Sequence, residues 1–537
     1  MDYRYAISLI FEAHLPFVRE YKKDDELSQL GEEGRFFDFV SEYFLPLLET
    51  LNRLENDHIP FRITIAVSPV LCHMLNDELL QKKYLHYIDK QIEFGKHELD
   101  RTADNADLNN LVQMYFNQIT ESKIAYTDVY EKNLLKAIDS FRRKGKVEIM
   151  ASCATHAFMP FISRNHESMQ AQMEIPASLY KRHFGGVPQG FWLPWLGWDQ
   201  ELEPYLTANN YTYTVLDSHG LLFGNPMPEK GCFYPVKAPG GAYIFGRDLK
   251  AVREIRKYAA DEIYRNSERD AGYELAQEII SPFLTGDSKR HRTGYKYWAH
   301  SASAYNGNAQ NIYNPKAASE KASIHAKAFL ENTIARLEEA SKHMDKPPIS
   351  VNAHNAASFG AFWYEGLQFM ENVFRMAKDV SGLKFVCPSE FILKQDLSSI
   401  QTVKPEYTSS GVNGYAETWL NVSNDWIYRH LLRAMERMTE LAERFPDDTG
   451  LKERALNQAA REILLAQSSD WSALLHKQDA TEYAHIKAEN SLRNFTTIYE
   501  ALGSNYISTE WLTTLERKHN IFPNINYRVF RRKSNSK

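Results

Sequence analysis

The first part of the chain alternates short apolar runs with longer stretches in which apolar residues recur every three or four positions. Such runs are typical of buried strands, and a stretch such as 36–54 is typical of an amphipathic helix. Because strands that alternate with helices form parallel βαβ units, we predict a parallel α/β fold. The expected strands are 5–11, 62–67, 147–151, 190–193, 213–216, 349–353 and 384–386.

Two regions break this alternation. The interval 222–314 is rich in Gly, Pro, Tyr and charged residues, which indicates an insertion carried on loops of the barrel. After Pro405 the pattern is helical throughout, with expected helices at 426–445, 450–468, 481–502 and 508–518. We therefore predict a barrel over 1–400, an inserted subdomain over about 222–314 and a C-terminal helical domain over 405–525.

The composition and charge of the chain exclude some classes of protein. The chain has 537 residues, of which 43% are hydrophobic and 25% charged, as in ordinary globular proteins with more than one part. A net charge of -6 offers no basic surface for nucleic acid. No apolar run approaches the roughly 20 residues of a membrane span, and no signal peptide is recognisable. We expect a cytoplasmic protein without nucleic-acid or membrane partners.

The cysteines favour neither a zinc site nor a disulfide framework. The four are scattered along the chain without a Cys-x-x-Cys pair: Cys72, Cys153, Cys232 and Cys387. This spacing fits a reducing compartment.

Polar residues follow several of the expected strands. In a barrel of parallel strands, functional side chains lie at the carboxyl ends. Glu12 and His14 follow the first strand, His156 follows the strand at 147–151, and Asn355 follows the strand at 349–353. A single histidine is more often structural than catalytic, but two histidines at strand ends, each followed by a proline, predict one shared polar pocket.

Ordered segments along nearly the whole chain carry a family resemblance. They are Ala13–Arg19, Ala154–Pro160, Gly190–Pro194, Phe245–Asp248, Arg292–Trp298, Phe359–Gly366, Trp419–Asn421 with Asn424–Trp426, and Ser468–Trp471. Through them the chain resembles glycoside hydrolase family 57, and within it the 1,4-alpha-glucan branching enzymes. The resemblance implies an incomplete (β/α)7 barrel, an inserted helical subdomain and an all-α C-terminal domain.

The resemblance also implies that two catalytic groups of the family are missing. A retaining glycosidase needs two carboxyl groups about 5 to 5.5 Å apart, one as nucleophile and one as acid and then base. Aligned with the family, the nucleophile position is Trp195 and the acid/base position is Asn355. An indole cannot form a glycosyl ester, and an amide has no proton to give near neutral pH, so both halves of double displacement are absent.

Further departures from the family gather at the same end of the barrel. At five positions the chain departs from the residue that the family commonly has. Glu12 and Ala361 each replace a histidine, and Ala357 replaces an acidic residue. Ala299 replaces an arginine, and Ser410 replaces a tryptophan. Scaffold segments are largely intact. Losses confined to the site, on a retained fold, are typical of a pseudoenzyme.

We therefore expect a branching-enzyme homologue that is catalytically inactive or impaired, and that binds an α-glucan or malto-oligosaccharide or acts as a scaffold for a protein partner. The expected binding residues are Glu12, His14, His156, Trp298, Trp363, Asp470 and Trp471. The tryptophans would stack on sugar rings, although core packing is an equally ordinary role for Trp363.

Two alternatives stay open. The first is an active 1,4-alpha-glucan branching enzyme, a retaining transferase, with relocated acids; the candidates are Glu12, Asp199, Glu201, Asp248 and Asp470. The second is a purely structural protein with a filled cleft. Glu12, His14 and His156 could together bind a metal, but no paired ligand spacing supports it, so we expect no metal and no cofactor.

Overall fold

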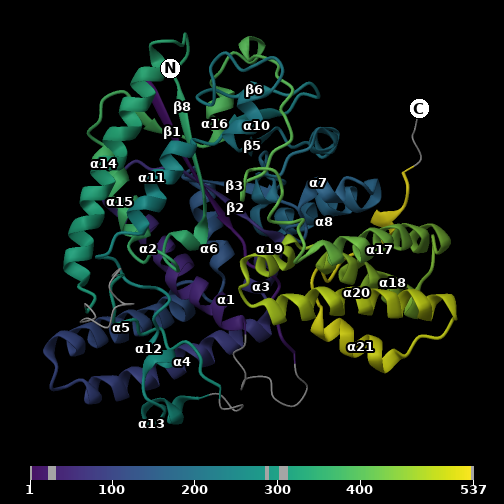
Figure 1. The fold of residues 1–537 in the computed structure, drawn as a ribbon, viewed down its shortest axis with the longest axis horizontal. Coiled ribbons are helices and arrows are strands. Elements are labelled where there is room, and N and C mark those ends of the chain that lie inside the picture. Colours follow the sequence, from purple (N-terminus) through teal and green to yellow (C-terminus); the bar gives the residue numbers. More distant parts are fainter. Residues whose placement is uncertain (1–2, 22–31, 285–288, 301–311, 534–537) are drawn as a thin grey trace.

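Parallel strands at the centre of the molecule form an incomplete (β/α)7 barrel (Figure 1). The computed structural model describes residues 3–21, 32–284, 289–300 and 312–533. The strands are β1 (Tyr5–Ala13), β2 (Ile63–Val67), β3 (Val147–Ser152), β4 (Phe191–Trp192), β5 (Tyr213–Leu216), β6 (Val236–Lys237), β7 (Tyr243–Gly246), β8 (Ile349–Asn355) and β9 (Leu383–Phe385).

The order of the strands closes the wall of the barrel. One sheet has the order β4-β3-β2-β1-β8, and β5 pairs with β7 in a second sheet. Isolated parallel bridges connect the two, from Gly190 to Tyr213 and from Arg247 to Val351. Strands β1 and β2 are nearly continuous apolar runs because parallel strands are covered on both faces.

Strand β7 corrects the sequence interpretation of the interval 222–314. The strand lies inside the interval that we read as an insertion, yet it pairs in parallel with β5 and its neighbour Arg247 reaches β8. The interval therefore contributes to the barrel wall, in addition to the antiparallel β6 and the surface helices. The bounds of the three predicted domains stay predictions.

Helices surround the strands. The predicted helix 36–54 is confirmed as α1 and α2, which are joined by a π-helical turn at Val40–Phe44. The helices of this part are α1 (Glu33–Phe39), α2 (Leu45–Asn56), α3 (Pro69–Leu75), α4 (Glu78–Arg101), α5 (Ala106–Ile124), α6 (Leu134–Arg143), α7 (Met159–Ile162), α8 (His166–Phe184), α9 (Glu203–Ala208), α10 (Ser218–Leu222), α11 (Leu249–Ala259), α12 (Ala271–Glu274), α13 (Gln277–Ile280), α14 (Pro315–Ser341), α15 (Gly366–Ala377) and α16 (Pro388–Leu393).

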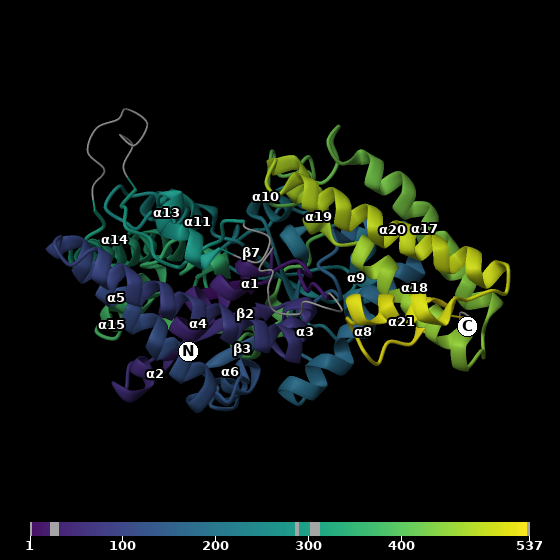
Figure 2. The same ribbon diagram turned by 90° about the horizontal axis from the view of Figure 1, so that it is seen from below.

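The C-terminal part is helical, as predicted, and lies beside the barrel (Figure 2). Its helices are α17 (Asp425–Arg444), α18 (Gly450–Ala466), α19 (Ser469–Lys477), α20 (Thr481–Gly503) and α21 (Thr509–Lys518). The start of α19 contacts the barrel directly, because Ser468 bridges Ala157 and the amide of Ser469 donates to the carbonyl of His156 at 3.2 Å. The C-terminal helices thus reach the loops at the carboxyl ends of the strands.

Within the ranges that the structure describes, the helices are too short or too polar to cross a bilayer.

The opposite, amino-terminal end of the barrel holds a half-buried acid, Glu148, whose titration is testable. Burial raises the pKa of Glu148 to about 7, despite hydrogen bonds from the Tyr213 hydroxyl and Ser389. An unfolded glutamate titrates near 4.3, so the free energy of unfolding should fall by up to about 4 kcal/mol as the pH rises from roughly 4.3 to 7, and stay constant above that.

The variant Glu148→Gln should remove this slope. Urea unfolding between about pH 5 and pH 8 should show the variant gaining stability relative to the unmodified protein as the pH rises. Glu229→Gln, which changes an exposed glutamate, is the control and should leave the slope unchanged. Parallel pH profiles for Glu148→Gln and the unmodified protein would contradict the prediction.

Candidate functional site

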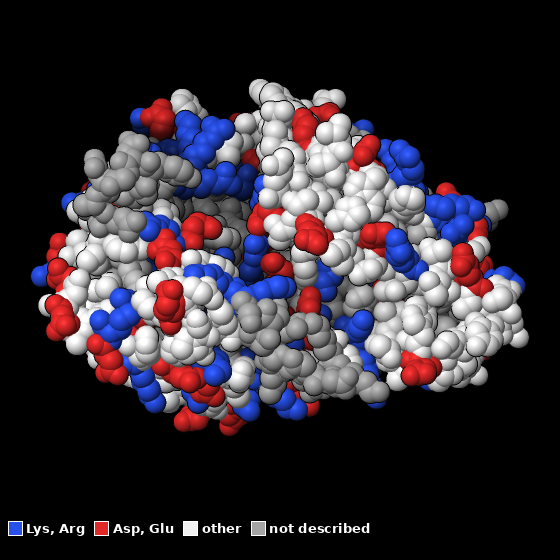
Figure 3. Space-filling view, turned by 60° about the horizontal axis from the view of Figure 1, so that its bottom comes forward, with Lys and Arg blue, Asp and Glu red and all other residues white. Residues whose placement is uncertain are grey.

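A cavity of about 490 Å³ opens at the carboxyl ends of the barrel strands. The barrel loops and α19 both line it, which places residues from distant parts of the chain around one space. In Figure 3 the surface is hollowed, and basic and acidic side chains gather around the hollow. The lining includes His14, Arg35, Asp38, His156, Trp195, Glu268, Arg292, Asn355, Phe362, Asp470, Leu474, Lys477, Asp479 and Tyr483.

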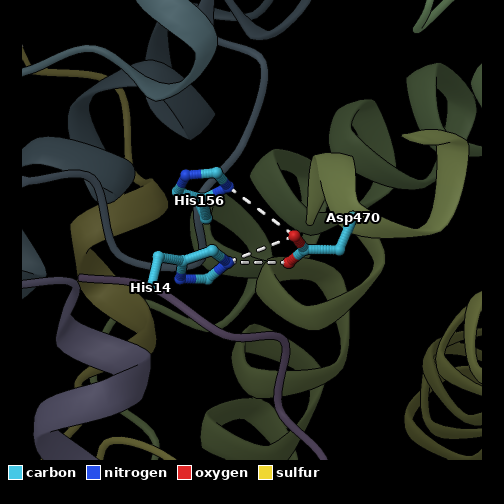
Figure 4. A group of neighbouring side chains, drawn as sticks. All are labelled: His14, His156 and Asp470. Carbon is cyan, nitrogen blue, oxygen red and sulfur yellow. Dashed lines mark hydrogen bonds and ion pairs between the residues drawn. The ribbon is translucent and has the colours of Figure 1, made fainter. Parts of the chain in front are cut away.

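Two stacked imidazoles form one wall of this cavity (Figure 4). The rings of His14 and His156 lie 3.6 Å apart between centroids, at an angle of 10°. Nε2 of His156 contacts Oε1 of Glu12 at 2.7 Å, and Nε2 of His14 contacts Oδ2 of Asp470 at 2.9 Å. The indole N–H of Trp192 also donates to Glu12, at 2.6 Å. The predicted shared polar pocket exists, with a carboxylate on each side of the histidine pair.

This environment lowers the pKa of both acids and of His14, although the dominant cause differs. Burial raises the pKa of Asp470, but His14 and His156 outweigh it and hold the pKa at about 2. Burial alone would also raise the pKa of Glu12, but the contact with His156 outweighs burial and lowers the pKa below its usual value. Burial, partly opposed by Asp470, lowers the pKa of His14. Near neutral pH both carboxyls are therefore ionised and cannot donate a proton.

The same residues resemble a metal site in composition. His14, His156 and Asp470 place possible ligand atoms within 4.8 Å of one another. An imidazole binds a metal through a lone pair that lies in the plane of its ring. Since the two rings are stacked 3.6 Å apart and nearly parallel, one ion cannot lie in both planes. This geometry does not fit a metal as it stands, and the expectation of a metal-free site stays a prediction.

Trp195 is fixed at the edge of the cavity. It follows β4 with a φ of 58°, in the left-handed region that large side chains seldom adopt. Its indole N–H donates to Oγ of Ser469 at 2.7 Å, and its carbonyl accepts from the amide and hydroxyl of Ser410 at 2.6 and 2.8 Å. The ring also packs against His156 and Trp419, 5.5 and 5.2 Å away.

Asn355 lies across the same cavity at the end of β8. It pairs in register with Glu12 of β1, and its Oδ1 accepts from the amide of Ala357 at 2.9 Å. Asn355 and Trp195 both line the cavity together with His14 and His156. The structure thus brings the two substituted positions and the polar wall into one site.

The predicted tryptophan platforms do not all face this cavity. Trp363 and Trp471 are each only 2% exposed, in the core, so neither can offer a ring face to a sugar. The indole of Trp471 donates to the carbonyl of Leu465. Trp298 is half-buried, donates to Glu274 and does not line the cavity. For Trp363 and Trp471 the role in core packing replaces the predicted role in binding.

Much of the cavity lining was missed by the sequence interpretation, and two of the missed residues, Phe362 and Glu268, bear on binding and catalysis. Phe362 is 57% exposed and lines the cavity, although it stands next to Trp363 in a segment already singled out. Nothing local distinguishes which of these two aromatic rings is buried. Glu268 also lines the cavity, and no pattern in its neighbourhood marks it.

Comparison with known proteins assigns the family. The family model described as glycosyl hydrolase family 57 matches residues 8–278, and the model described as 1,4-alpha-glucan branching enzyme, C-terminal, matches residues 430–530. The chain belongs to glycosyl hydrolase family 57. This confirms the resemblance inferred from the ordered segments.

Similar proteins share the whole architecture of this family 57 chain. The 1,4-alpha-glucan branching enzyme TK1436 of Thermococcus kodakarensis is 24% identical, over 96% of this chain and 77% of its own. The alpha-amylase AmyC of Thermotoga maritima superposes with a TM-score of 0.91 at 30% identity, covering 99% of this chain and all of its own (100%). The family 57 branching enzyme of Pyrococcus horikoshii gives 0.87 at 24% identity, over 100% of this chain and 98% of its own, and supports the fold alone.

The contact between His14 of the barrel and Asp470 of α19 can be tested by stability. Because folding lowers the pKa of Asp470 to about 2, Asp470→Asn should lower the free energy of unfolding by about 2 kcal/mol at neutral pH. This contribution is complete above the unfolded pKa of about 3.9 and is lost as the pH falls towards about 2. Urea unfolding measures it, with the exposed Asp379→Asn as control. Equal losses in the two variants would contradict a special role for Asp470.

Proposed function

We propose that this family 57 protein binds an α-glucan or malto-oligosaccharide in the cavity and cleaves it poorly or not at all. The observation that carries this proposal is the placement of Trp195 and Asn355. Both line the one cavity at the strand ends, at the positions where the family resemblance puts the nucleophile and the acid/base. Neither side chain can perform the assigned step, because an indole forms no glycosyl ester and an amide donates no proton.

The nearby carboxyls are poor replacements. Asp470 is ionised and held by His14, and Glu12 lies behind His156. Burial raises the pKa of Asp38, but its two oxygens accept from the Tyr87 hydroxyl and, at 3.0 Å, from Arg292. Each oxygen of Asp38 already accepts one hydrogen bond, which leaves fewer positions for a departing glycosidic oxygen.

Glu268 is the residue that an active alternative would need. It is an exposed acid on the cavity wall, and its side chain forms no ion pair or hydrogen bond with another residue of the described ranges. For a branching enzyme with relocated acids, which would need two carboxyls, Glu268 is therefore one candidate, and it is absent from the five predicted from sequence.

The shape and chemistry of the cavity support sugar binding. A pyranose ring has an apolar face and a rim of hydroxyls, so it needs a ring to stack on and polar groups at its edge. Phe362 and Trp195 offer rings, and His14 and Asp470 offer polar atoms, around a volume in the usual range for small ligands. The similar proteins are named as branching enzymes and an amylase, which favours an α-glucan as the ligand.

Activity on amylose tests the catalytic half of the proposal. We expect no loss of iodine-complex absorbance and no new reducing ends with the unmodified protein. The double variant Trp195→Glu with Asn355→Asp should gain measurable activity, since it supplies both carboxyls and general acid catalysis alone is worth about 10²- to 10⁴-fold. Trp195→Gln with Asn355→Asp is the matched control, because it removes the indole without adding a nucleophile.

A different result would identify the active alternative. If the unmodified protein acts on amylose and Glu268→Gln abolishes that activity while Glu229→Gln does not, the proposal of an inactive site is wrong. In that case Glu268 on the cavity wall would supply the catalytic acid.

Binding tests the other half. Maltoheptaose should raise the melting temperature of the protein and retard it in affinity electrophoresis. Phe362→Ala should weaken this binding by about tenfold, because it removes an exposed stacking ring worth about 0.5 to 1.5 kcal/mol beyond its area. Phe223→Ala removes a ring that is 67% exposed outside the cavity lining and is the control.

No binding by the unmodified protein would favour the purely structural alternative. Binding that is equally strong in Phe362→Ala would place the ligand elsewhere on the molecule.

A further inference from the structure

Two helices from different parts of the chain line the barrel cavity. Each contributes four residues to the lining, which are Arg35, Phe36, Asp38 and Phe39 on α1 and Asp470, Ala473, Leu474 and Lys477 on α19. The contact of Asp470 with His14, which ties α19 to the barrel, is buried. The walls of the cavity are thus fixed to each other on their inner side.

An exposed ion pair joins the same two walls at their outer edge. Nη1 and Nη2 of Arg35 donate to Oδ2 and Oδ1 of Asp479, in the turn between α19 and α20, at 3.0 and 2.8 Å. Both residues line the cavity, and their side chains are 40% and 48% exposed. The Arg35–Asp479 pair therefore bridges the rim of the cavity.

The turn that carries Asp479 is strained. Gln478 and Ala480, on either side of Asp479, have φ values of 56° and 45°, in the left-handed region that residues other than glycine seldom adopt. Such strain persists only where surrounding contacts hold it, and it clusters at ligand clamps and switches. The amide of Asp479 donates to the carbonyl of Leu474 at 3.1 Å, and Arg35 fixes the side chain. The arrangement of the turn therefore depends partly on its contact with α1.

The rim pair can open without separating the two parts of the molecule. The hydrogen bond with Arg35 lowers the pKa of Asp479, so this carboxyl is ionised near neutral pH. An exposed ion pair nevertheless contributes little to stability, even where a bidentate geometry makes the most of it. Arg35 also contacts Glu32 at 3.1 Å and keeps that partner when Asp479 moves away. Opening therefore costs far less than breaking the buried contact of Asp470.

We infer that the Arg35–Asp479 pair is a latch at the rim of the cavity, which opens to let a glucan in or out and closes behind it. The inference rests on the proposed function, since it takes a glucan as the ligand of the cavity. A latch that does not contact the ligand changes the rates of entry and release by the same factor, and it leaves Kd unchanged.

Stopped-flow fluorescence of the full chain with maltoheptaose tests the latch. Asp479→Asn should raise the association and dissociation rate constants together by about two- to fivefold, the range that one exposed ion pair allows, with Kd unchanged. Asp479→Glu keeps the charge and should stay closer to the unmodified protein. Glu482→Gln changes an exposed acid at the start of α20, outside the cavity lining, and should leave both rate constants unchanged.

Salt gives a second readout of the same pair. Maltoheptaose is uncharged, so its entry into a cavity without a latch should depend little on ionic strength. Screening of the rim pair should raise both rate constants of the unmodified protein between roughly 0.05 and 1 M NaCl. In Asp479→Asn the same increase in salt should have no such effect.

Two kinetic results would overturn the inference. One is that both rate constants are unchanged in Asp479→Asn, which would show that the pair does not limit entry. The other is a change in Kd carried by the dissociation rate constant alone, which would make Asp479 a contact of the sugar.

Hydrogen exchange separates failure of the latch from failure of the proposed function. The amides of residues 473–484 should exchange faster in Asp479→Asn than in the unmodified protein, and high salt should remove the difference. If maltoheptaose does not bind the unmodified protein, the proposed function fails, and faster exchange in Asp479→Asn would still support a latch on this cavity. Equal exchange in the two proteins at low salt would overturn the latch for any ligand.

Discussion

The site depends on a buried arrangement of two carboxylates around two stacked imidazoles. Glu12, His14 and His156 come from the barrel, whereas Asp470 comes from α19 in the C-terminal part. Removing one carboxylate of such a set would leave its imidazole partner without a buried hydrogen-bond partner, which costs about 1 to 3 kcal/mol. The polar wall of the cavity and the contact between the barrel and the C-terminal helices are therefore one structure.

Trp195 is built into this same structure. Its indole donates to Ser469, the first residue of the helix that carries Asp470, and its ring packs against His156. The polar wall of the cavity is present, while the predicted nucleophile position holds a tryptophan. A retained family 57 fold does not by itself establish the reaction, because fold and chemistry are separable. Binding without turnover is the function that this combination supports best.

A local sequence pattern could predict part of this site. Glu12, His14 and His156 were found because they follow long apolar strands, and the frame around Trp195 and Asn355 was found through the ordered segments. Phe362 and Trp363 show the limit, since adjacent aromatic residues in an irregular loop have no periodicity that says which is buried. Strand β7 was missed for a related reason: four residues in a region rich in Gly and Pro give too short a pattern.

The sequence by itself determined the alternation of strands and helices, the helical C-terminal part and the family, because each of these depends on residue identity or on short-range spacing. It also predicts the loss of both catalytic carboxyls. Only the tertiary structure decided which charges meet. His14 and Asp470 are 456 positions apart, and their contact depends on how α19 packs on the barrel. The burial, the hydrogen-bond partners and the pKa of Asp470 follow from that packing. Its carboxyl could therefore not be assigned as ionised, paired or free before the fold was known.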